Sequence, residues 1–129
     1  MGSTNFRFSA LAALAGRAPI GGQREVALAT YVVARLAEDV ALDRGLTEAV
    51  RSERAGHAKQ WLSTLALPAR MRQAFSDSAD ASARDCSGAA LAIRGVITAT
   101  VGLLDPAARH ELDRLVEMLE GLAPQLGVT

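Results

Sequence analysis

The chain has 129 residues, half of them apolar, and its fourteen basic and fourteen acidic side chains cancel. A chain of this length is most simply one domain, here 1–129, that can bury a substantial core. The zero net charge argues against a strongly basic nucleic-acid binder, and the single cysteine excludes an intrachain disulfide.

Residues 1–18 hold a short helical pattern with apolar side chains at Phe8, Leu11 and Leu14. We interpret this segment as a short helix at the periphery of the domain. A secretory signal is disfavoured because the apolar run is short and only Arg7 precedes it. A proline and two glycines within residues 19–22 then predict a turn.

Three helices are expected in the next part of the chain. Residues 23–44 form an amphipathic pattern, and Thr47 can cap a second helix that runs to about Leu65. Pro68 opens a short helix that ends near residue 76. The polar residues 77–82 predict a loop, and Ser82 with Asp85 fits a capping box for the helix that follows.

Residues 81–104 form the most apolar stretch, and we predict that they are the central helix of the fold. Two adjacent helical stripes run along it: Cys86, Ala90, Ile93, Ile97, Val101 and Leu104 on one, and Ala89, Ala92, Val96, Ala99 and Leu103 on the other. A helix this apolar is buried on several sides. Residues 96–101 are rich in β-branched side chains and could form a strand, but the length of the stretch favours a helix. Arg94 and the short apolar run argue against a membrane span.

Three glycines in this stretch predict a close helix contact. Gly88, Gly95 and Gly102 are seven residues apart and fall roughly above one another on a helix. Each costs about 1 kcal/mol in a helix interior. We therefore expect another backbone to approach them closely, either within the chain or from a second copy.

The last helix has the clearest start in the chain. Asp105 precedes Pro106, which is an N-cap followed by proline at the first helical position. The apolar pattern runs to about Leu122, and Gly121 and Pro124 predict its end. With only five aromatic residues, the core must consist of Ala, Leu and Val. The predicted fold is an all-α, four- to five-helix bundle, mainly antiparallel.

No pattern in the sequence indicates catalysis or a bound cofactor. His57 and His110 are the only histidines, which is too few for a zinc or di-iron site of known spacing. No glycine-rich phosphate loop follows a strand, and no serine stands in a strained glycine-flanked turn. We predict no enzyme activity, no metal and no cofactor.

DNA binding is the main alternative function. Residues 44–76 carry six basic groups and only two acids, and Val40, Ala41 and Gly45 resemble part of a helix-turn-helix. A DNA-binding regulator would use this basic 44–72 region. The residues that would contact phosphates are Arg51, Arg54, Lys59, Arg70 and Arg72. The simpler interpretation is a solvated, arginine-rich helix face.

The leading hypothesis is a non-enzymatic helical interaction or regulatory module that acts through protein–protein contacts or self-association. A basic middle segment and an acidic C-terminal third could face each other within the fold or between copies, and a homodimer is the favoured state. A small apolar-ligand carrier is a further alternative, because an Ala-rich bundle can leave a cavity. Absent disulfides fit a cytoplasmic protein, and thirteen arginines against one lysine suggest a bacterial source.

Overall fold

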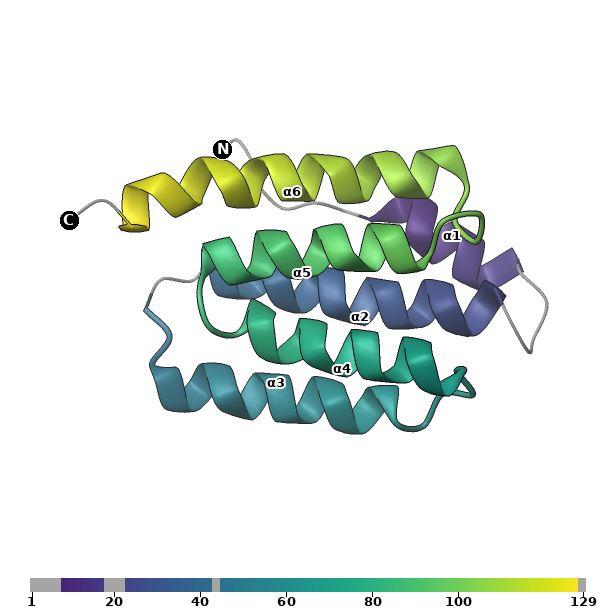
Figure 1. The fold of residues 1–129 in the computed structure, drawn as a ribbon, viewed down its shortest axis with the longest axis horizontal. Coiled ribbons are helices and arrows are strands. Elements are labelled where there is room, and N and C mark those ends of the chain that lie inside the picture. The colour runs from purple at the N-terminus through teal and green to yellow at the C-terminus, as the bar shows by residue number, and fades with distance from the viewer. Residues whose placement is uncertain (1–7, 18–22, 43–44, 128–129) are drawn as a thin grey trace.

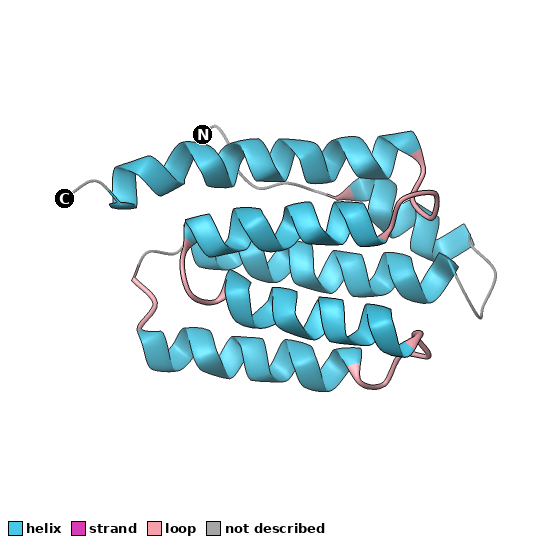
Figure 2. Cartoon of the chain, in the orientation of Figure 1, coloured by secondary structure: helices cyan, strands magenta, loops and turns pink. Residues whose placement is uncertain are grey.

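The computed structural model describes residues 8–17, 23–42 and 45–127, without the side chains of 123–127. These described residues form six α-helices and no strand (Figure 2). The helices are α1 (Ser9–Arg17), α2 (Gln23–Leu42), α3 (Glu48–Leu62), α4 (Ala69–Ser82), α5 (Cys86–Ala99) and α6 (Pro106–Gly127). The all-α class is confirmed. The helix number exceeds our expectation because the two short segments, α1 and α4, both form complete helices.

The helices form an antiparallel bundle of two layers (Figure 1). Helices α3, α4, α5 and α6 lie side by side in chain order, and each runs opposite to the one before it. Helix α2 lies behind this layer, and α1 packs against α2 and α6.

The central helix is α2, not the predicted 81–104 segment. Among the described elements, α2 packs against all five other helices, whereas α5 packs only against α2, α4 and α6. Four alanines around α2 are fully buried: Ala27, Ala29, Ala34 and Ala37. Small side chains on several sides let neighbouring backbones approach closely, which is why α2 can be surrounded.

The boundary between α4 and α5 also differs from the prediction. Residues 77–82 are the second half of α4 rather than a loop, because Phe75, Ser78, Ala79 and Ser82 follow helical spacing and are buried. The predicted capping box is therefore wrong. Instead Asp85 is the N-cap of α5, and its carboxylate accepts a hydrogen bond from the Gly88 N–H at 2.6 Å.

Two other predicted helix starts are confirmed, while the ends of the last two helices differ from the prediction. Thr47 Oγ1 accepts from the Val50 N–H at 3.2 Å, and Asp105 Oδ1 accepts from the Ala108 N–H at 2.9 Å. Helix α5 ends at Ala99 rather than at residue 104, and α6 continues to Gly127 rather than ending near Leu122.

One end of the bundle is tied together by contacts between its first and last helices. The Glu111 carboxylate of α6 accepts hydrogen bonds from the Ala10 N–H at 2.9 Å and the Leu11 N–H at 3.1 Å. These are unsatisfied donors at the start of α1, so Glu111 caps α1 from another helix. Arg17 pairs with Asp105, which joins the other end of α1 to the start of α6.

Candidate interaction surfaces

Helix α5 presents an exposed face that we call the outer strip, made of Ser87, Leu91, Gly95 and Thr98. These residues follow one another at spacings of four, four and three, so they share one side of the helix. All four are exposed, and Leu91 is 72% exposed. Val101, 66% exposed, follows in the turn after the helix. Two large apolar side chains thus stand in solvent beside small residues.

The three glycines predicted to act alike have different environments. A Cβ at Gly88 would stand 2.8 Å from the Ala81 carbonyl oxygen, so another backbone does approach there. A Cβ at Gly95 would have nothing within 4 Å. Gly102 lies in the turn after α5 with a φ of +82°, which favours glycine for conformational reasons. Within the described chain only Gly88 makes the predicted contact, and contact of Gly95 with a second copy stays a prediction.

Three of the five basic residues proposed to contact phosphates are bound within the chain. Arg51 donates from Nε to the Ala83 carbonyl and from Nη1 to the Leu46 carbonyl, both at 3.0 Å. Lys59 Nζ lies 3.0 Å from the Asp80 carboxylate. Arg72 donates to the Leu67 carbonyl at 3.1 Å. These side chains join α3 to α4 and stabilise the loop before α4.

The remaining two, Arg54 and Arg70, are exposed and lie on different helices, α3 and α4. Arg54 lies beside α2, whereas Arg51 and Lys59 contact residues at the end of α4. The resemblance to a helix-turn-helix does not extend to the geometry, because α2 and α3 lie alongside each other as an antiparallel pair (Figure 1). The helices of that motif cross at about 90–120°.

A shallow, open groove runs between α2 and α3, and we call it the α2/α3 groove. Its lining residues are Tyr31, Val32, Arg35, Leu36 and Asp39 of α2, with Arg54, His57, Ala58 and Trp61 of α3. This surface was not predicted from the sequence. Its one local signal is Trp61, which stands among polar residues of α3 and is 44% exposed.

The groove combines aromatic and basic side chains. The Arg35 guanidinium lies over the Tyr31 ring at 5.9 Å from its centroid, and its Nε lies 3.8 Å from Glu38. Glu38 is only 2% exposed, so its carboxylate lies below the surface. No hydrogen bond or ion pair joins Arg54 to any residue that the structure describes.

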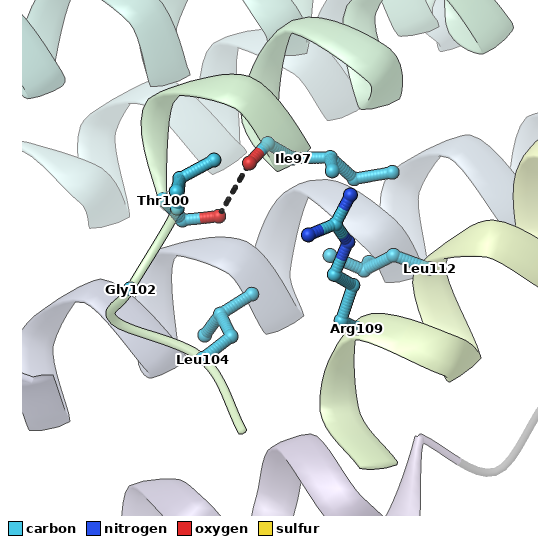
Figure 3. Close-up of a pocket in the computed structure, with 7 residues that line it drawn as sticks. Ile97, Thr100, Gly102, Leu104, Arg109 and Leu112 are labelled. Carbon is cyan, nitrogen blue, oxygen red and sulfur yellow. Dashed lines mark hydrogen bonds between the residues drawn. The ribbon is translucent and has the colours of Figure 1, made fainter. Parts of the chain in front are cut away.

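A second, much smaller pocket lies where α5 meets α6. Ile97, Thr100, Gly102, Leu104, Arg109 and Leu112 surround it, as Figure 3 shows. Its volume is about 30 Å³, which is room for a water molecule or two. Ligand pockets measure about 300–1,000 Å³, so this pocket does not supply the cavity that an apolar-ligand carrier needs. That alternative stays a prediction.

The described residues offer neither a metal centre nor a helix that spans a membrane. Across 8–17, 23–42 and 45–127, no three His, Cys, Asp or Glu side chains gather where they could hold a metal ion. No helix in this part of the chain is long and apolar enough to cross a membrane. No protein-family model, curated protein or solved structure matches the chain.

Proposed function

We propose that this protein is a non-enzymatic helical interaction or regulatory module that self-associates as a dimer through the outer strip of α5. The observation that carries the proposal is the pairing of Leu91, 72% exposed, with the open surface at Gly95 one helical turn away. Isolated apolar side chains on a surface are ordinary, but a large one beside a small one on the same helix face suits helix packing.

A two-fold contact would use this pair symmetrically. In a dimer of identical subunits the same patch meets itself. Leu91 and Gly95 are four residues apart, so a two-fold axis between them lays each Leu91 over Gly95 of the other copy. The missing side chain at Gly95 then gives Leu91 its space.

Replacement of Gly95 by glutamate tests this proposal. The Cβ at Gly95 meets nothing within 4 Å in the monomer, so the variant should fold normally. In the dimer the same side chain would bury a carboxylate against Leu91, and association should be lost. Light scattering coupled to gel filtration, over a concentration series, measures the mass of both proteins.

Gly56→Glu is the matched control, since Gly56 is also a mid-helix glycine with nothing near its Cβ, and it lies on α3. It should dimerise like the natural protein. A natural protein that stays monomeric up to millimolar concentration, or a Gly95→Glu variant that dimerises unchanged, would show that the outer strip is not an interface.

A further inference from the structure

We propose that the α2/α3 groove binds an acidic, amphipathic helical segment of a partner protein. This site lies on α2 and α3, while the outer strip lies on α5, so the inference goes beyond self-association and does not depend on it. Two observations carry it: a large exposed aromatic side chain in an open groove, and a rim whose exposed charges are mainly basic.

The floor of the groove is an apolar surface against which one face of a helix can pack. Trp61 remains 44% exposed, although a tryptophan is the side chain that gains most from burial. The buried Leu36 and the partly buried Val32 line the same groove from α2. A groove between two aligned helices accepts the side-chain ridge of a third, and its anchors repeat at every third or fourth residue.

The rim determines the charge of the partner. Arg35, Arg54 and His57 line the groove at exposed positions, and Asp39 is the one acid among the lining residues that the structure describes. Glu38 contacts Arg35 from below the surface and offsets part of its charge, so Arg54 is the main cation that a ligand in the groove meets. Arg54 is not engaged by any described residue. Complementary charges across an interface favour a partner with carboxylates on its polar face.

A nucleic acid fits these observations less well than an acidic helix. Phosphate binding depends on several basic side chains along one track. Here Arg51 and Lys59 contact α4, and Asp80 stands on that side. What remains at the groove is a short basic rim around an apolar floor, which is the pattern of a helix-binding groove.

Trp61 provides a direct readout, because it is the only tryptophan in the chain. The probe is a synthetic helical peptide with leucine at every third and fourth position and glutamate elsewhere, without aromatic residues. Its addition should move the Trp61 emission to shorter wavelength and reach saturation. The same peptide with lysine in place of glutamate should produce no such shift. Added salt should weaken the binding of the glutamate peptide.

Three single variants test the role of the rim. Arg54→Glu should weaken binding of the glutamate peptide by about tenfold or more. Asp39→Asn removes the one acid among the described lining residues and should tighten binding. Arg70→Glu makes the same charge change at an exposed arginine of α4 outside the groove, and binding should be unchanged.

Several outcomes would overturn the proposal. These are no emission change with the glutamate peptide, an equal change with both peptides, or equal weakening by Arg54→Glu and Arg70→Glu. A duplex oligonucleotide that displaces the peptide and binds more tightly would assign the groove to nucleic acid instead. A shift of the Trp61 emission with protein concentration alone, equal in Gly95→Glu, would mean that the α2/α3 groove binds a second copy of this chain.

Discussion

Helices α2 and α5 show that the most apolar helix need not be the central one. Helix α5 contains one charged residue, Arg94, whereas α2 contains five. Yet α2 packs against all the other described helices, and α5 keeps Leu91 in solvent. The difference lies in how small side chains are distributed around the circumference. A helix can be surrounded where alanines admit neighbours on several sides, and apolar surface left outside such a centre is free to bind another molecule.

The largest expected effect is the difference in stability between a variant with a glutamate introduced on α2 and one with a glutamate introduced on α5. Ala34 on α2 is fully buried, so Ala34→Glu places a carboxylate where no partner is built for it and should destabilise the fold by about 3–5 kcal/mol. Leu91→Glu on α5 should change the stability of the monomer by no more than about 0.5 kcal/mol. Urea unfolding in dilute solution measures both. Similar losses for the two variants would contradict the assignment of α2 as the centre.

Smaller effects are expected for alanine at two glycines of α5, and the two changes in stability should have opposite signs. Gly88→Ala forces a methyl group against the Ala81 carbonyl and should cost about 1–3 kcal/mol. Gly95→Ala meets nothing and should stabilise the helix by about 0.5–1 kcal/mol. Thermal unfolding of both variants, with Gly56→Ala as a reference for an open helical glycine, measures the contrast. A stabilising Gly88→Ala would mean that the α4–α5 turn is looser than described.

The smallest effect concerns the start of α5. Asp85→Ala removes the acceptor for the Gly88 N–H and should cost about 1 kcal/mol. Asp85→Asn keeps an oxygen that can accept the same hydrogen bond, so most of the stability should return. Denaturant midpoints of the two variants distinguish a cap from a purely electrostatic role. Equal losses would indicate that the charge, rather than the hydrogen bond, holds the helix end.

Local signals in the sequence were sufficient for much of the fold. Thr47 and Asp105 each stand before a helix and bond to a backbone N–H three residues later, so their roles are visible in the chain itself. The spacing of apolar residues was enough for the all-α class. These are short-range rules, and they hold because the partner groups are neighbours in sequence.

The features that escaped prediction depend on residues far apart in the chain. The polar segment 77–82 is helical because Ser78 and Ser82 are buried at helical spacing, and Ser78 Oγ lies 3.4 Å from the Ala92 carbonyl of α5. The α2/α3 groove exists only after two helices align, and neither helix alone indicates it. The central position of α2 rather than α5 likewise depends on which helices pack together, and the composition of each helix does not specify this.

The Glu111 cap has a consequence for how the chain is made. The hydrogen bond from Ala10 to Glu111 spans 101 residues, so during synthesis the first helix emerges from the ribosome long before its cap exists. Contacts that close so long a loop form late. Helix α1 can pack against α2 as soon as both have been translated, but its first N–H groups have no Glu111 acceptor until α6 follows. Completion of the last helix is then the event that caps the first.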